Sequence, residues 1–193
     1  MAPSVVAIGK AAIDINGFQK WAMGNLVDNL TRATYAEWLV GQALDVIGPD
    51  DMRMEWDAAD FWYRGHPIEV KAGGRGQRWQ QTKPSTVRYD IAQRREAWNA
   101  STNEWEAHDK PLRNADVYVF CLHTPVQATN GNVADPACWE FRVVATTALN
   151  KELRSQKTVG LGTLDRLTSP IGWVGVRQAV DAALKARGQA TGG

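Results

Sequence analysis

An acidic residue precedes a predicted β-hairpin, and an acid and a lysine stand two positions apart on the second strand. These residues are Asp60, Glu69 and Lys71. Because strand side chains alternate between faces, we expect Glu69 and Lys71 on one side and the intervening Val70 in the core. Two carboxylates could then share a cation, with an ammonium group beside them.

These residue types suit metal-dependent hydrolysis of a phosphodiester. Mg²⁺ prefers oxygen ligands and retains several waters, so Asp60, Glu69 and the backbone carbonyl of Val70 would suffice, with Mn²⁺ as the alternative ion. The ion would polarise the phosphate and activate a water, while Lys71 would orient that water or stabilise developing charge. An acid and a lysine on one strand face also form a common solvated ion pair, worth about 0–1 kcal/mol. Both interpretations are open at this point.

A third acid, Glu37, lies where apolar spacing predicts an amphipathic helix over residues 31–44. It stands between Ala36 and Trp38, on the face expected to pack against the sheet. A carboxylate there is costly unless it is paired, protonated or bound to a metal. A salt bridge to Arg32 or another base is therefore the alternative to a role in a metal site.

In this order and at this spacing, the helical acid, the acid before the hairpin and Glu69-Val70-Lys71 resemble the PD-(D/E)xK nuclease superfamily. The resemblance covers about residues 31–122 and implies an α/β, restriction-endonuclease-like fold, with a mixed central sheet flanked by helices in the order α-β-β-β-α-β. It implies Asp60 and Glu69 as metal ligands, Lys71 as the catalytic lysine and Glu37 as an auxiliary acid. DNA would be the substrate and Mg²⁺ or Mn²⁺ the cofactor.

A narrower resemblance, to a group of small bacterial proteins with this nuclease core, extends over most of the chain. It rests on residues 72–81, 114–123 and 138–144 and implies no particular substrate. Members of the superfamily often carry small hydroxyl residues after the lysine. This chain has Ala72-Gly73-Gly74 there, so the resemblance says little about what that loop contacts.

Asp57 is the alternative to Asp60 as the first metal ligand. It ends a segment, Met52–Trp56, that is itself a candidate strand. Asp60 is preferred because it directly precedes Phe61 and the run into the hairpin turn. A shift of the strand register would put Asp57 in its place.

The charge of the chain is unevenly distributed, although its net value is only +1. Acids outnumber bases nine to three in residues 28–70, whereas bases outnumber acids seven to two in residues 71–98. The first segment should attract cations and the second phosphates. Glycines in the second segment allow backbone amides to approach a phosphate, and polar or aromatic side chains could contact bases or sugars. The candidate nucleic-acid-binding residues are Arg75, Gln77, Arg78, Trp79, Gln81 and Lys83, unless this stretch is simply a solvated loop.

Length and composition predict one domain with a sizeable core. The chain has 193 residues, of which 44% are hydrophobic and 22% charged, and we expect a single domain over 1–187 with a flexible tail at 188–193. No run approaches the ~20 apolar residues of a membrane helix, and no signal-peptide pattern is present. A cytoplasmic protein that does not enter the membrane is expected. Cys121 and Cys138 are expected to be small core residues rather than a disulfide.

Three further segments indicate scaffold. The apolar run Ala115–Leu122 predicts a strand buried on both faces, and Trp139–Val144 predicts a strand with one wet face. Residues 174–186 have the spacing of an amphipathic helix that closes the domain.

Three functional hypotheses follow. The first is a Mg²⁺- or Mn²⁺-dependent DNA endonuclease acting in restriction or repair. The second is a nucleic-acid-binding module on the same fold that has lost hydrolysis, and the third is a protein in which the Glu69–Lys71 pair is only structural. Two-fold symmetric cutting would require a homodimer, and a separate partner could supply specificity. The DNA sequence, structure or modification recognised, and DNA rather than RNA as the substrate, are left open by the sequence.

Overall fold

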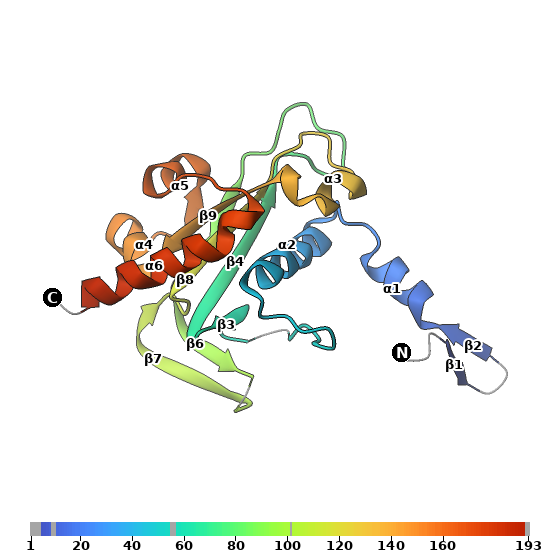
Figure 1. Cartoon of the computed structure of the whole chain (residues 1–193), viewed down its shortest axis with the longest axis horizontal. Coiled ribbons are helices and arrows are strands. Elements are labelled where there is room, and N and C mark those ends of the chain that lie inside the picture. The colour runs from blue at the N-terminus through green and yellow to red at the C-terminus, as the bar shows by residue number, and fades with distance from the viewer. Residues whose placement is uncertain (1–4, 9–10, 55–56, 101, 192–193) are drawn as a thin grey trace.

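The computed structural model describes residues 5–8, 11–54, 57–100 and 102–191, and it describes side chains from Asp14 to Arg187 within those ranges. These residues form a mixed α/β fold in which helices flank a central sheet (Figure 1). The α/β class and the mixed sheet that the sequence predicts are therefore confirmed.

The central sheet contains four of the described strands. They are β3 (Phe61–Tyr63), β4 (His66–Gly74), β8 (Val117–His123) and β9 (Trp139–Ala145), in the order β3-β4-β8-β9. β4 runs parallel to β8, whereas β3 and β9 are antiparallel to their neighbours.

The predicted hairpin is present as β3 and β4. Its two turn residues, Arg64 and Gly65, have φ values of 51° and 79°, as a two-residue type I′ turn requires. Pairing runs from Tyr63–His66 only as far as Phe61–Ile68. Beyond Ile68, the side of β4 that faces away from β8 has no strand partner among the described residues. We call this side of residues 70–74 the open edge.

Two apolar clusters cover the two faces of the sheet. One joins Val117, Val119 and Cys121 of β8 to α2 (Asn29–Leu44) and α6 (Val176–Thr191). The other joins Tyr118, Phe120 and Leu122 of β8 to α4 (Thr146–Leu153) and α5 (Leu161–Leu167). β8 is therefore buried on both faces, as its apolar run predicts. α2 lies against β4 and carries the predicted helix 31–44, which begins two residues earlier than expected.

The remaining elements lie at the periphery. A ribbon of β6 (Arg94–Asn99) and β7 (Glu104–Leu112) projects from the body, and an N-terminal unit stands apart from the central sheet (Figure 1). That unit consists of β1 (Val5–Ile8), β2 (Ala11–Asp14) and α1 (Ile15–Met23). β5 (Arg88–Asp90) pairs with β10 (Thr158–Gly160). Short elements are α3 (Asn130–Ala134) and 3₁₀ turns at Pro136–Cys138 and Trp173–Gly175.

The order of elements departs from α-β-β-β-α-β between β4 and β8. The connection from β4 to β8 contains β5, β6 and β7, and no helix is assigned between these strands in the described part of the chain. Residues 52–54 of the candidate strand Met52–Trp56 have no regular structure, and residues 55–56 lie outside the described residues. Residues 188–191, expected in a flexible tail, continue the backbone of α6, and residues 192–193 are not described.

The expectation of a wet face on β9 is wrong. Arg142 lies on that face and is only 4% exposed, because α5 covers it and supplies Asp165, whose Oδ1 accepts a 2.6 Å hydrogen bond from Arg142 Nε. Glu140 accepts a second bond of 3.1 Å from the same guanidinium. Cys121 and Cys138 are both free thiols. Within the described ranges, no helix is long and apolar enough to cross a membrane.

The packing of α2 on the hairpin gives a stability prediction at Gly41. A Cβ atom at Gly41 would lie 2.3 Å from Ile47 Cδ1 and 2.9 Å from Phe61 Cζ. The gain of about 1 kcal/mol in helix propensity should be outweighed by overpacking, which costs about 1–3 kcal/mol. We expect Gly41→Ala to lower the free energy of urea unfolding. Gln42→Ala, at an exposed neighbour on the same helix, is the control, and a more stable Gly41→Ala protein would contradict this packing.

Candidate active site

Asp60 lies immediately before β3 and contacts the open edge. Its Oδ2 atom accepts a 2.6 Å hydrogen bond from the backbone N–H of Val70. Pairing between β3 and β4 stops at Phe61, so the chain leaves the sheet just where the acid begins. The end of a strand therefore places this carboxylate beside the backbone of β4.

The carbonyl of Val70 points to the same edge as its N–H. In a strand, the N–H and carbonyl of one residue point to the same side, and those of the next residue point to the opposite side. The carbonyl of Pro67 accepts a 2.8 Å bond from Asp116 N–H on the β8 side, so Pro67, Glu69 and Lys71 use their backbone toward β8. Val70 directs its N–H and carbonyl the other way. Asp60 and the Val70 carbonyl thus offer oxygen ligands on one side of β4, as a hard cation requires.

Glu69 and Lys71 are brought together on the same face of β4, as predicted. Their side chains form an ion pair through Oε1 of Glu69 and Nζ of Lys71, while Ile68 and Val70 are buried beneath α2. Burial by itself would lower the pKa of Lys71, but the charges of Glu69 and Asp60 outweigh it, and the pKa is raised. Lys71 is therefore an ammonium group at neutral pH and can act as a fixed positive charge rather than as a base.

The pKa of Asp60 is raised by burial and by the other acids that lie close to its carboxyl group. Burial and the negative charges of Glu69 and Glu37 raise its pKa from 3.8 to about 7, against the opposing effects of the Val70 N–H and Lys71. The ionised carboxylate is thus unfavourable in this position. A bound divalent cation would reverse the balance, because it would stabilise the same charges that now repel one another.

Glu37 is close enough to Asp60 to raise its pKa, and it is also paired. Arg53 donates from Nε to Oε2 of Glu37 at 2.5 Å and from Nη2 to Oε1 at 3.1 Å. The base is therefore not Arg32, the partner named from the sequence, but an arginine of the loop after α2. Sequence reasoning missed Arg53 because a residue in an irregular loop carries no periodic signal.

Asp57 binds backbone N–H groups other than that of Val70. Its Oδ1 accepts hydrogen bonds from the backbone N–H groups of Ala58 at 2.7 Å and Ala100 at 3.2 Å. It thereby ties the segment before β3 to the end of β6. The acid that touches Val70 is Asp60, so Asp60 is the better candidate for the first metal ligand, and that assignment stays a prediction.

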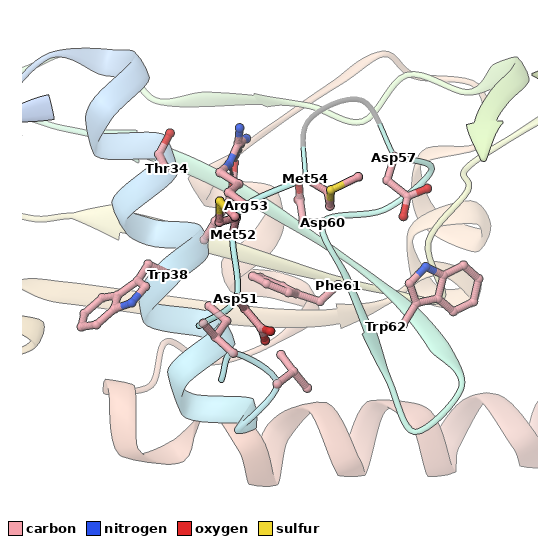
Figure 2. A pocket seen from close by; sticks show the side chains of 13 residues that line it. Thr34, Trp38, Asp51, Met52, Arg53, Met54, Asp57, Asp60, Phe61 and Trp62 are labelled. Carbon is pink, nitrogen blue, oxygen red and sulfur yellow. Dashed lines mark hydrogen bonds and ion pairs between the residues drawn. The ribbon is translucent and has the colours of Figure 1, made fainter. Parts of the chain in front are cut away.

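A cavity of about 460 Å³ adjoins Asp60 and Glu37. Figure 2 shows Asp60 and Phe61 between Trp38, on α2, and Trp62, on β3. Trp38 and Trp62 are 47% and 56% exposed. A cavity of this size with aromatic walls suits a small flat ligand.

A second, smaller cavity of about 180 Å³ lies on the other face of β4. Glu69, Lys71, Asp90, Arg94 and Tyr118 are among its lining residues, and Asp57 borders both cavities. The four predicted catalytic residues are therefore grouped around β4, with Asp60 and Glu37 opening to one side and the Glu69–Lys71 pair to the other.

The predicted nucleic-acid-binding residues divide into two groups. Gln77 and Gln81 shape their own loop, because Gln81 Oε1 accepts a 2.7 Å bond from Gln77 N–H and Gln81 Nε2 donates to Ser85 Oγ at 2.9 Å. Arg78 is exposed and donates to Asp28 at 3.2 Å. The three others, Arg75, Trp79 and Lys83, are exposed and have no ion pair or ring contact among the described residues.

The oxygen atoms available here suit a hard cation that keeps water as most of its ligands. Asp60, the Val70 carbonyl and Oε2 of Glu69, which Lys71 does not contact, are oxygen atoms around one strand. Among the described residues, no three His, Cys, Asp or Glu side chains lie close enough together to form a metal site by themselves. Most of the ligands of a bound ion would have to be water or substrate, as is usual for Mg²⁺.

No family model, curated protein or solved structure matches this chain. The role of the cluster is therefore inferred from its own geometry and chemistry.

The raised pKa of Asp60 predicts a pH-dependent effect of Asp60→Asn. Between about pH 4 and pH 7 the folded protein retains a proton that the unfolded chain releases, so wild-type stability falls as the pH rises through this window. An amide carries no such charge and can still accept from Val70 N–H. We expect the stability of Asp60→Asn relative to wild type, measured by urea unfolding, to rise from pH 4 to pH 7 and then level off.

Two further measurements check the cause of this effect. Glu37→Gln should shift the window to lower pH, because it removes one charge that raises the pKa of Asp60. Millimolar Mg²⁺ at pH 8 should reduce the advantage of Asp60→Asn. A difference between the two proteins that is constant with pH would show that Asp60 ionises as readily in the folded as in the unfolded chain.

Proposed function

We propose that this protein is a Mg²⁺- or Mn²⁺-dependent deoxyribonuclease that hydrolyses phosphodiester bonds, with a restriction-endonuclease-like core of the PD-(D/E)xK type. The observation that carries the proposal is the contact of Asp60 with the backbone of Val70, between Glu69 and Lys71. An acid, a carbonyl, a second acid and an ammonium group are thereby grouped around the middle of β4. This is the set of groups that metal-assisted attack on a phosphate needs.

The arrangement of the central elements supports this fold. A helix that bears an acid, α2, precedes a hairpin, and the strand with Glu69-Val70-Lys71 runs parallel to the next strand of the sheet. The strands that replace a crossover helix between β4 and β8 are a departure. They lie outside the α2–β4 unit that positions the site.

The residues of the chain would have distinct tasks. Asp60, Glu69 and the Val70 carbonyl would hold the metal ion, with Glu37 as the auxiliary acid, and the ion would polarise the phosphate and activate a water. Lys71, whose pKa is raised, would present its ammonium group to the negative charge that accumulates on the phosphate oxygens. It would remain protonated throughout, so the proton of the attacking water must pass to another group or to solvent.

The aromatic cavity beside Asp60 supports a nucleic acid as substrate. Trp38, Phe61 and Trp62 line it, and an unstacked base can stack on such side chains, worth about 1–3 kcal/mol per base. A scissile phosphate at Asp60 would place the neighbouring nucleoside within reach of this cavity. That combination favours a nucleic acid over a small phosphodiester.

A nucleic-acid-binding module without hydrolysis is the second candidate. The observation that favours it is that Glu37 and Glu69 are each neutralised by a base of the same chain, Arg53 and Lys71. Binding that weakens steeply with salt, without product in Mg²⁺ or Mn²⁺, would identify it.

A cleavage assay tests the nuclease. Purified protein should convert plasmid, linear, branched or single-stranded DNA to product with Mg²⁺ or Mn²⁺ and not with chelator. Asp60→Asn, Glu69→Gln and Lys71→Ala should each lower the rate by at least about a hundredfold, because each removes a ligand or charge from the transition state. RNA of the same sequence, assayed in parallel, determines whether the activity is specific for DNA.

The control is Lys151→Ala, at an exposed lysine of α4, a helix that packs on β9. It should cleave like the wild type. Equal cleavage by the three site variants and the wild type would refute the assignment of the site, and no cleavage by any protein would favour the binding module.

A further inference from the structure

A third cavity, of about 320 Å³, lies between the beginning of α2, the end of β4 and the segment that leads into β5. Its polar lining consists of two arginines, two hydroxyl groups and two amides, and no carboxylate lines it. The side chains are Arg32, Arg88, Ser85, Thr86, Asn29 and Gln77. All of these groups can donate a hydrogen bond, and two carry a positive charge.

Arg32 is a buried cation whose hydrogen-bond acceptors, among the described residues, are all neutral. It is 2% exposed, and its guanidinium donates to the carbonyl of Gly76 at 2.9 Å and to the side-chain oxygens of Gln77 at 3.3 Å and Asn29 at 2.5 Å. Each of these acceptors is neutral, and Arg32 forms no ion pair with any described residue. Burial lowers the pKa of its guanidinium. Buried charges are normally paired, and an anion held in this cavity would supply such a partner.

The surroundings of Arg32 allow an anion to approach closely. Gly74 lies against the guanidinium, where a Cβ atom would be 2.7 Å from Nη1 and 2.8 Å from Cζ. Arg88, on β5, is exposed and likewise forms no ion pair in the described part of the chain. Asp28, the residue before α2, is bound to Arg78 at 3.2 Å and is not one of the residues that line the cavity.

We propose that this cavity is a phosphate-binding subsite, in which Arg32 and Arg88 hold a phosphate group of the nucleic acid strand that the site at Asp60 acts on. The identity of the ligand as part of a nucleic acid rests on the proposed function. Gly74 lies four residues beyond Val70 on β4, or about 13 Å at ~3.3 Å per residue. A nucleic acid strand that follows the open edge would thus place one phosphate at Asp60 and another at Arg32.

The phosphate has two sources with the same chemistry. It is either an internal phosphodiester of a longer strand or a terminal phosphate, which would make the protein act near DNA ends. The arginine fork matches the oxygens of both. The experiment therefore uses oligonucleotides that differ only in their ends.

Binding is measured in chelator, so that no cleavage is needed for a result. Inorganic phosphate is titrated into the protein by calorimetry, and single-stranded oligonucleotides with a 5′-phosphate, a 3′-phosphate or neither are titrated by fluorescence anisotropy. The variants are Arg88→Gln, which removes an exposed charge, and Gly74→Ala, which displaces Arg32 but keeps its charge. Lys151→Gln, on α4, is the matched control for loss of one positive charge.

The wild type and Lys151→Gln should bind inorganic phosphate, and both cavity variants should bind it about tenfold more weakly. Arg88→Gln should also weaken oligonucleotide binding about tenfold and reduce its salt dependence by about one released ion. An effect on all oligonucleotides indicates an internal phosphate, and an effect confined to one phosphorylated end indicates a terminal one.

Equal binding of phosphate and of all oligonucleotides by Arg88→Gln and the wild type would overturn the subsite, even if DNA is cleaved. Phosphate binding that Arg88→Gln weakens, in a protein that cleaves nothing, would support the subsite and count against the nuclease. The result for Gly74→Ala counts only if this variant unfolds at the same denaturant concentration as the wild type. If it does not, the result for Arg88→Gln alone tests the subsite.

Discussion

The early end of β3 determines what the neighbouring strand can do. If β3 continued to pair with β4 beyond Ile68, the backbone of Val70 would be used within the sheet. Because pairing stops at Phe61, the Val70 N–H is free to bind the carboxylate of Asp60, and its carbonyl faces the same edge. An unpaired strand edge is ordinarily a liability for aggregation. Here the carboxylate of Asp60 accepts from the first free donor of that edge, and α2 covers the adjoining face of β4.

The acids at this edge are kept close together at an electrostatic cost. Asp60 is partly buried and lies near Glu69 and Glu37, and the rise of its pKa to about 7 reflects how unfavourable its charge is there. Arg53 and Lys71 offset part of that repulsion by pairing with the two other acids. A structural cluster would be more stable with fewer acids. The repulsion at Asp60 is what the proposed cation would relieve, with water or substrate supplying most of its other ligands.

Local signals explain which parts of the fold could be predicted from the sequence. The hairpin follows from Arg64-Gly65, which suits a turn with two positive φ angles, and from the alternation of Glu69, Val70 and Lys71. The central strand β8 follows from its continuous apolar run. The failures concern contacts between segments far apart in the chain. Arg142 was expected to face water because no local pattern shows that α5 will cover it, and the pairing of Glu37 with Arg53 depends on a loop without periodicity. For the same reason, a buried Arg32 without an acid could not be recognised before α2 was placed beside Gly74.

The acidic and basic segments of the sequence meet within β4. The acidic segment 28–70 ends and the basic segment 71–98 begins within this single strand. Its first half lies among carboxylates, at Asp60 and Glu69. Its last residues lead into the basic loop and lie beside Arg32, one of the few bases of the acidic segment. A strand with attraction for cations at one end and for phosphates at the other has the polarity needed to bind a metal ion and a polyanion side by side. Neither segment would do so alone, because a polyanion is repelled by the acids unless a cation and the arginines lie on its path.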